Sequence, residues 1–454
     1  MPPRPILFIA REPDETLRTF LPVLAELRQR GRDCLVLFHH EPSAWALERL
    51  AQLKVSTIRV CVPGRDPPAG MLGALGLSSA AAELAQLWAV RGLARRLIAR
   101  LDPAAVVVIQ DTLLLERFLV REANRRGRGT VVVQWAFTFP QSTYDRLRQI
   151  QALGGRLPAG SSRGVPPSSP RARGQSERGE GPRDGGRRFS TRLYDLIQQL
   201  LGVKFDLVNS YGGGEARVFA VMGEAFREQF LAQGVRKARI EVTGHPLHDA
   251  AFAQRSAASA ERWAALRARY GLPAGSRVIL YATQPVLWRA VMTREALIEN
   301  VRGLGRAVEA LGPEFLLVLK LHPREALEDY ASVIEPERRT RLLKDAEITE
   351  LIGPAEAFIS SSSSTVLLAM MLDKPIVTIN FNRVPHFDYY ASVGGTLHAR
   401  TVPEAAEALR LAIFDEPTRA RLAAERAAVL ARYARFDGRA VERLADLILA
   451  EARG

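Results

Sequence analysis

The sequence predicts an α/β protein made of two doubly wound domains, and three observations lead to this fold class. Short apolar runs alternate with helical segments in both halves of the chain. These runs are continuous in Val, Ile and Leu, as expected when helices cover both faces of a parallel sheet. The length of 454 residues is enough for two cores of about 200 residues each.

The N-terminal half supplies the first set of elements, and we place an N-terminal Rossmann-like domain at residues 1–150. A helix is expected from about Asp14 to Arg30, because an Asp near the start and Gly31 after the end are typical helix boundaries. A second helix is expected within LLLERFLVREANRR. Strands are expected at residues 5–10, 34–40, 56–62, 104–110 and 130–137.

Residues 151–192 interrupt this pattern with a Gly-, Pro-, Ser- and Arg-rich segment that we interpret as a disordered basic insertion. The segment holds nine arginines and three acidic residues. Its excess of six positive charges is close to half of the net charge of +14. The rest of the chain is mildly basic without an aromatic-rich RNA-binding stretch, so we expect no nucleic-acid partner. The insertion is either a lid or membrane-facing loop, or a tolerated surface segment.

The alternation of strands and helices resumes after the insertion. Residues 193–245 are expected to complete the N-terminal domain and to connect it to a C-terminal Rossmann-like domain at 246–400, followed by C-terminal helices at 401–454. Strands are expected at 217–223, 239–244, 278–282, 315–321, 357–361 and 375–379. Helices are expected from Glu224 to before Gly234, from about Thr293, from Thr365 to Leu372, and from Val402 onward.

The composition excludes several other classes of protein. The two cysteines, Cys34 and Cys61, lie in apolar runs and provide neither a disulfide framework nor a metal-ligand spacing. No apolar run approaches the roughly 18 residues that cross a bilayer, and the start of the chain does not have the pattern of a signal peptide. We therefore expect a cytoplasmic protein, and its basic excess leaves peripheral contact with a membrane surface open.

Four loops of the second half stand where a doubly wound sheet binds its ligand, beyond the carboxyl ends of strands. They are VTGHPLHD with His245, LYATQPVLW with Thr283 and Gln284, LKLHPRE with His322 and Arg324, and the serine run 360–364. A single His-Pro pair is also consistent with a plain strand terminator. Together, the four loops predict a ring of polar groups around an anionic ligand.

The serine run has its own physical rationale. If a helix begins near Ser364 or Thr365, its first backbone N–H groups are unsatisfied and its dipole favours an anion there. Capping the helix explains one serine but does not need five. We therefore predict that Ser362, Ser363, Ser364 and Thr365 bind phosphate, with simple capping as the alternative.

The segments VFAVMGEAFREQFLAQGV, IEVTGHPLHD, LKLHPRE and SSSSTVLLAMMLDKPIV resemble the C-terminal half of GT-B glycosyltransferase-like proteins. Within this group the chain resembles CDP-glycerol glycerophosphotransferases and bacterial polysialyltransferases, and more distantly the non-hydrolysing UDP-N-acetylglucosamine 2-epimerases. The resemblance covers about residues 218–380 and is only architectural over 1–140. It implies two Rossmann-like domains facing a cleft, with a nucleotide-activated donor held at His322, Ser363, Ser364 and Thr365. Because helix N-termini and cationic groups can stabilise charge on the leaving phosphate, we expect no obligatory metal and no cofactor besides this donor.

The chain departs from these families at two places. Relatives commonly carry an acidic residue in the helix after the serines, where this chain has Ala369. The glycerophosphotransferases also carry a His-Gly pair after an N-domain strand, where this chain has Gln134 and Trp135. The resemblance therefore leaves the identity of the donor and of the catalytic base open.

A transfer of this kind needs a group that stabilises the leaving phosphate and a base that takes the acceptor proton. His322 or Arg324 is the candidate for the first role. Asp111 and then Glu12 are our candidates for the base, although Asp111 is equally placed to cap the next helix. His39, His40, Asp14 and Glu15 also stand at strand ends of the N-terminal half.

The loop NFNRVPHFDYYASVGG, residues 380–395, is either a sugar-binding loop or an ordinary packed loop. In the first case Phe387 or Tyr389 stacks on the sugar. The hydrogen-bonding candidates of this loop are Asn382, Arg383 and His386.

The sequence as a whole predicts a transferase that moves a glycosyl or glycerophosphoryl group from a nucleotide-activated donor to a hydroxyl acceptor, carbohydrate or lipid-linked, in surface polysaccharide or glycolipid synthesis. One alternative is a UDP-N-acetylglucosamine 2-epimerase, and another is a non-catalytic nucleotide-binding scaffold. The sequence does not predict the oligomeric state.

Overall fold

The computed structural model describes residues 4–62, 78–135, 137, 212–284, 292–323, 325–333, 339–383 and 385–453, without the side chains of 78–84, 385 and 386. The chain divides into two compact units, which we describe separately. The first consists of Met1–Trp135, Gln175–Leu247 and Arg439–Gly454, and the second of Ala136–Gly174 and His248–Gly438. The predicted insertion 151–192 lies outside the described residues.

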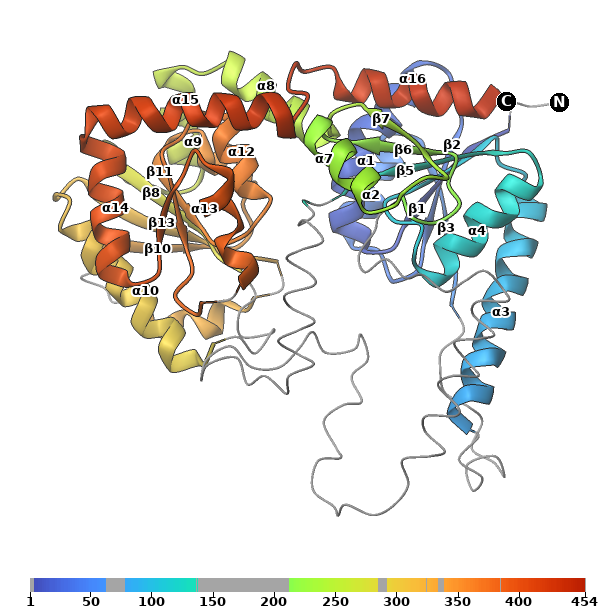
Figure 1. Cartoon of the computed structure of the whole chain (residues 1–454), viewed down its shortest axis with the longest axis horizontal. Coiled ribbons are helices and arrows are strands. Elements are labelled where there is room, and N and C mark those ends of the chain that lie inside the picture. The colour runs from blue at the N-terminus through green and yellow to red at the C-terminus, as the bar shows by residue number, and fades with distance from the viewer. Residues whose placement is uncertain are drawn as a thin grey trace. The chain divides into compact units, whose positions relative to one another are not determined.

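The first unit contains a parallel sheet with the strand order β3-β2-β1-β4-β5-β6-β7 (Figure 1). Its strands are β1 Ile6–Ala10, β2 Cys34–Phe38, β3 Ser56–Arg59, β4 Ala105–Val108, β5 Gly129–Val133, β6 Val218–Val221 and β7 Arg239–Val242. Phe8 of β1 is in register with Val36 of β2 on one side and with Val107 of β4 on the other. The strand order reverses between β1 and β4, so the carboxyl ends of these two strands form the crevice of this sheet.

Helices enclose the core of the first unit. They are α1 Pro13–Gln29, α2 Ala44–Gln52, α3 Ser78–Leu101, α4 Leu114–Arg125, α7 Glu224–Ala232 and α16 Ala440–Arg453, and α8 Pro246–Ser256 starts at its boundary. Phe8 packs edge-on against Phe20 of α1 with ring centroids 5.0 Å apart. Leu444 and Ile448 of α16 belong to the same core cluster. The last helix of the predicted segment 401–454 thus packs in the first unit, although the two helices before it, α14 Val402–Phe414 and α15 Glu416–Tyr433, belong to the second.

Gly129, the first residue of β5, allows α16 to approach the sheet closely. A Cβ atom at this position would lie 2.7 Å from the carbonyl carbon of Glu451 in α16, well inside van der Waals contact. We expect Gly129→Ala to lower the free energy of unfolding by about 1–3 kcal/mol, the usual cost of overpacking. Urea denaturation measures this cost. Gly92→Ala is the matched control, because Gly92 lies inside α3 with only the end of the Arg96 side chain nearby, and equal destabilisation of both variants would contradict the argument.

The second unit contains a parallel sheet with the order β10-β9-β8-β11-β12-β13 (Figure 1). Its strands are β8 Arg277–Ala282, β9 Phe315–Lys320, β10 Thr340–Leu343, β11 Ala355–Ser360, β12 Ile376–Ile379 and β13 Leu397–Ala399. This is the strand order of a Rossmann fold, with its reversal between β8 and β11. The expected α/β class with two doubly wound sheets is confirmed.

Helices cover both faces of the second sheet. They are α9 Ala260–Arg269, α10 Arg294–Glu309, α11 Ile348–Ile352, α12 Thr365–Met371, α13 Tyr389–Val393, α14 Val402–Phe414 and α15 Glu416–Tyr433, with 3₁₀ turns at Leu327–Asp329, Ala331–Val333 and Pro385–Asp388. Leu280 and its neighbours in alternate positions of β8 join a core cluster with α12. Ile279 and Tyr281 join a second cluster with α10 and α14. Both faces of the strand are buried, which explains the continuous apolar runs.

No helix within the described residues is long and apolar enough to cross a membrane.

Candidate functional site

The serine run lies at the strand-order reversal of the second sheet. Ser360 ends β11 and α12 begins at Thr365, so the expected strand–turn–helix arrangement is confirmed. Ser363 Oγ accepts a hydrogen bond from the backbone N–H of Thr365 at 3.2 Å. Ser364, which occupies the N-cap position, is exposed and makes no side-chain cap. Capping therefore uses Ser363, and Ser364 presents its side chain to solvent.

Gln284, two residues after β8, holds the serine turn in place. In the amide orientation that satisfies its neighbours, Oε1 accepts from the backbone N–H of Ser362 at 3.0 Å and of Ser363 at 2.8 Å. The hydroxyl of the buried Tyr390 donates to the carbonyl of Ser363 at 3.0 Å. Two of the backbone donors that the sequence assigned to phosphate thus already have a partner within the protein, and Gln284 shapes the turn.

His322 follows β9 at the neighbouring strand end, next to Thr283 at the end of β8. The backbone N–H of His322 lies 3.1 Å from Thr283 Oγ1. Arg324 lies outside the described residues. The structure therefore brings together the loops of Gln284, His322 and the serines at one edge of one sheet, as the sequence predicts.

His245 belongs to the first unit, so it is not part of this edge. It is 3 % exposed, and its Nδ1 accepts from the backbone N–H of Leu247 at 3.3 Å, at the start of α8. Burial lowers the pKa of His245 to about 4, so the ring is neutral at pH 7. This geometry is that of a residue that orders the start of a helix.

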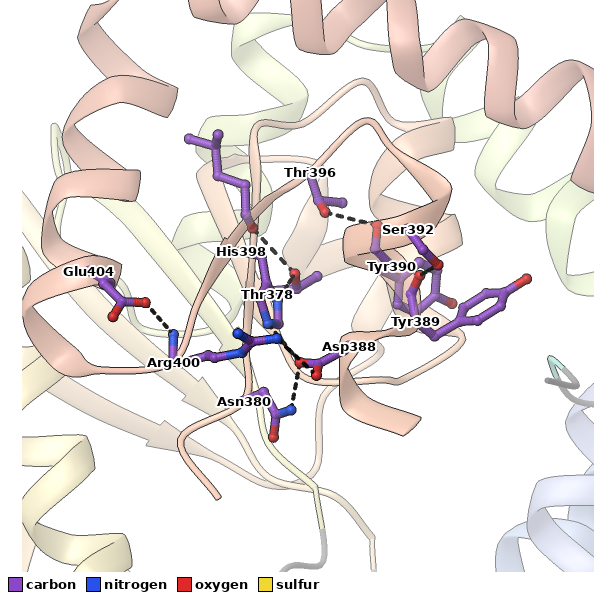
Figure 2. Close-up of polar contacts among 11 residues, drawn as sticks. Thr378, Asn380, Asp388, Tyr389, Tyr390, Ser392, Thr396, His398, Arg400 and Glu404 are labelled. Atoms are coloured by element: carbon purple, nitrogen blue, oxygen red, sulfur yellow. Dashed lines mark hydrogen bonds and ion pairs between the residues drawn. The ribbon is translucent and has the colours of Figure 1, made fainter. Parts of the chain in front are cut away.

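The loop after β12 contains a network around Asp388 (Figure 2). Its carboxylate accepts from Asn380 Nδ2 at 2.6 Å and contacts His398 Nε2 at 2.9 Å and an Arg400 guanidinium nitrogen at 3.2 Å. Thr378 Oγ1 lies 3.0 Å from the other ring nitrogen, Nδ1 of His398. Burial alone would raise the pKa of Asp388, but the hydrogen bonds from Asn380 and Arg400 outweigh it and lower this pKa. The network fixes the chain between β12 and α13.

The predicted sugar-stacking residues of this loop are packed against the protein. Phe387 is 3 % exposed and Tyr389 is 8 % exposed, and the Tyr389 hydroxyl donates to that of Tyr433 at 3.2 Å. Asn382 lines a small pocket together with Phe387 and Ser361. Arg383 is exposed, and the His386 side chain lies outside the described residues. Phe387 and Tyr389 therefore fit the alternative of an ordinary packed loop.

The two base candidates occupy different settings in the first unit. Asp111, at the carboxyl end of β4, is fully buried, and its Oδ2 accepts from the backbone N–H of Ala216 at 3.4 Å. Burial raises the pKa of Asp111 to about 6, although hydrogen bonds from the backbone of residues 212–216 oppose this rise. Its carboxylate thus binds this glycine-rich segment, and the N-cap of α4 is Leu113. Glu12 is the half-buried N-cap residue of α1 and makes no side-chain cap.

Asp14 and His39, which also follow strands of the first sheet, have polar neighbours within the first unit. The Asp14 carboxylate accepts from the Ser43 hydroxyl at 2.7 Å. His39 lies near Glu116 of α4, a buried acid that the sequence did not single out, and 3.7 Å separate Nε2 of His39 from Oε1 of Glu116. Among the described residues, no group of three or more His, Cys, Asp or Glu side chains is placed to hold a metal ion.

Solved structures with the same fold come from several enzyme classes. A glycosyltransferase from Rickettsia africae superimposes with a TM-score of 0.56 at 10% identity, covering 100% of this chain and 98% of the other. A variant of the wall teichoic acid polymerase TagF superimposes with a TM-score of 0.57 at 13% identity, covering 99% of this chain and 89% of the other. The UDP-GlcNAc 2-epimerase from Neisseria meningitidis, bound to UDP-GlcNAc, superimposes with a TM-score of 0.54 at 13% identity, covering 98% of this chain and 99% of the other. These likenesses show the fold, which is GT-B.

No curated protein matches the chain significantly. One protein family matches residues 220–450 of the chain. The match covers just over half of the chain and includes every loop of the second-sheet edge. With its GT-B fold and this match, the chain is a transferase that belongs to the CDP-glycerol:poly(glycerophosphate) glycerophosphotransferase family.

Proposed function

We propose that the protein transfers a glycerophosphoryl or glycosyl group from a nucleotide-activated donor to a hydroxyl of a growing surface polymer. The single observation that carries the proposal is the family match over 220–450, which contains the serine turn and the His322 turn on adjacent strands of one sheet. The donor's phosphates would contact this edge. The acceptor would be a carbohydrate or a lipid-linked polymer.

The chemistry needs no redox partner. In glycerophosphoryl transfer the acceptor oxygen bonds to the donor phosphorus, the bond from that phosphorus to the nucleotide oxygen breaks, and the nucleoside monophosphate leaves with the electron pair. In glycosyl transfer the acceptor oxygen bonds to the anomeric carbon and the nucleoside diphosphate leaves. The acceptor proton goes to a base in either reaction. Negative charge develops on the departing phosphate, where the exposed Ser364 hydroxyl and His322 can donate hydrogen bonds.

The test is a thermal-shift screen of the full chain with CDP-glycerol, UDP-N-acetylglucosamine and other UDP-, GDP- and CMP-linked sugars. A donor that binds only the folded state, present at a hundred times its Kd, raises the apparent stability by about 2.7 kcal/mol. We expect the double variant Ser363→Ala, Ser364→Ala to weaken binding of the best donor at least tenfold. Loss of the Ser363 cap would itself cost about 1 kcal/mol, so affinity is compared by titration and each variant is referenced to its own melting temperature.

The control variant is Ser276→Ala with Ser332→Ala, because Ser276 precedes β8 at its amino end and Ser332 lies in a 3₁₀ turn. Absence of any donor-induced shift, or equal donor affinity in the two double variants, would contradict the proposal. Incubating UDP-N-acetylglucosamine without acceptor separates the epimerase alternative, because an epimerase would form the manno epimer and a transferase would not.

A further inference from the structure

The carboxylate of Glu325 lies among three hydrogen-bond donors at the carboxyl ends of β8 and β9. Oε2 accepts from the backbone N–H of His322 at 3.0 Å and from the Thr283 hydroxyl, and Oε1 accepts from the Tyr330 hydroxyl at 2.6 Å. The backbone N–H of Glu325 donates in turn to the carbonyl of His322 at 2.9 Å. Glu325 thus closes the His-Pro turn from both its side chain and its backbone.

This carboxylate is buried, with 6 % of the residue exposed, and Tyr330 is 1 % exposed. Burial raises the pKa of Glu325, and the hydrogen bonds from Thr283, Tyr330 and His322 counteract that rise. A buried carboxylate costs free energy unless donors satisfy its oxygens. A smaller or apolar side chain at this position would leave the backbone N–H of His322 and the hydroxyls of Thr283 and Tyr330 without this acceptor.

The network extends to the serine turn through two consecutive residues after β8. Thr283 contacts Glu325 and the backbone N–H of His322, on the side of β9. Gln284 accepts from the backbone N–H groups of Ser362 and Ser363, on the side of β11. Because β8 lies between β9 and β11 in the sheet, these two consecutive residues, joined by their peptide bond, link all three loops through hydrogen bonds on either side.

We propose that Glu325 is a positioning residue of the donor site, which fixes the backbone of His322 and, through Thr283, the residue that holds the serine turn. This inference rests on the proposed function, since it assigns the donor phosphates to that edge. Glu325 is too enclosed to touch the donor, so it acts through His322 and Thr283.

Two pairs of variants of the full chain test the inference, with CDP-glycerol and UDP-N-acetylglucosamine as probes in titration calorimetry. Glu325→Ala is expected to weaken binding of the preferred probe at least tenfold. Glu325→Gln is expected to weaken it two- to threefold, because one amide oxygen still accepts from His322 and Thr283 while the Tyr330 hydroxyl can turn to accept from the amide. Glu328→Ala, an exposed acid three residues later, is the matched control and should bind like wild type.

The second pair keeps the test valid if Glu325→Ala does not fold. Thr283→Val keeps the shape and loses the hydroxyl, whereas Thr283→Ser keeps the hydroxyl, so only the Val variant should show the tenfold loss. A wild-type protein that binds neither probe nor any donor of the screen overturns the proposed function and this inference with it. A wild-type protein that binds, with variants of equal affinity, overturns the inference alone.

Discussion

Replacing Asp111 with alanine is expected to lower the free energy of unfolding by about 1–3 kcal/mol at pH 7, because the buried backbone N–H of Ala216 would lose its acceptor. Oδ2 of the carboxylate accepts a hydrogen bond from the backbone N–H of Ala216 at 3.4 Å. Ala216 lies 105 residues after Asp111 in the sequence. Asp111 thus joins two parts of the first unit through its side chain.

The glycines of this segment are consistent with that role. A Cβ atom on Gly214 would lie 2.6 Å from Cγ of Asp111, and a Cβ on Gly212 would lie 2.6 Å from Cγ of Phe219. Gly212 also has a φ of 69°, in the left-handed region that favours glycine. The close approach to the Asp111 carboxylate therefore requires glycine at position 214, and the Phe219 ring and the positive φ require glycine at position 212.

Asp14→Ala is the matched control for Asp111→Ala. Asp14 also follows a strand and accepts one hydrogen bond, from Ser43, but it is only half-buried. We expect it to cost less than about 1 kcal/mol, as measured by urea denaturation. Equal costs for the two variants would contradict the structural role of Asp111. An Asp111→Asn variant that keeps wild-type stability and donor affinity but loses turnover would instead support the base that the sequence suggests.

The strand pattern was readable from sequence because both faces of most strands are buried. In β8, Leu280 faces one core cluster and Ile279 faces the other, so every position is apolar. The edge strands β10 and β13 did not give this signal, because their segments, TRLL and LHA, are short and contain polar residues. The sequence analysis did not identify either of them.

The site was predictable in position but not in its contacts. Local patterns located the strand ends and the start of α12, which is sufficient to place the serine turn. The partner of that turn, Gln284, is 78 residues away from Ser362 in the sequence, and no local pattern shows that its amide occupies the turn's own N–H groups. Glu325 and Glu116 were missed for the same reason, since an acid within a helical or turn segment normally indicates a solvated face.

The pH dependence of stability should report on Glu116, whose pKa burial raises to about 7, with a hydrogen bond from its own backbone and the nearby Arg11 opposing the rise. The ordinary value is 4.5. Between pH 4.5 and 7 the unfolded chain ionises Glu116 while the folded protein keeps it protonated. The stabilising contribution of this group is therefore fully present below pH 4.5 and is lost as the pH rises through 7, by about 3 kcal/mol in total.

His39, whose Nε2 faces Glu116, contributes with the opposite sign. Burial lowers its pKa to about 4 from 6.5, with further lowering by Arg11 and His40, so its contribution is present above pH 6.5 and is lost as the pH falls through 4. The two contributions partly cancel in the wild type between pH 4.5 and 6.5. A wild-type profile alone would therefore hide both groups.

Glu116→Gln separates the two groups, because it keeps the size of the side chain and removes its titration. We expect the free energy of unfolding of this variant, relative to wild type, to rise by about 3 kcal/mol between pH 5 and pH 8, as measured by urea denaturation at a series of pH values. Glu48→Gln is the control, since Glu48 is exposed in α2, and its profile should run parallel to that of wild type. A parallel profile for Glu116→Gln would show that Glu116 is ionised in the folded protein across this range. Arg11, whose positive charge lowers the pKa of Glu116, would then be its cationic partner.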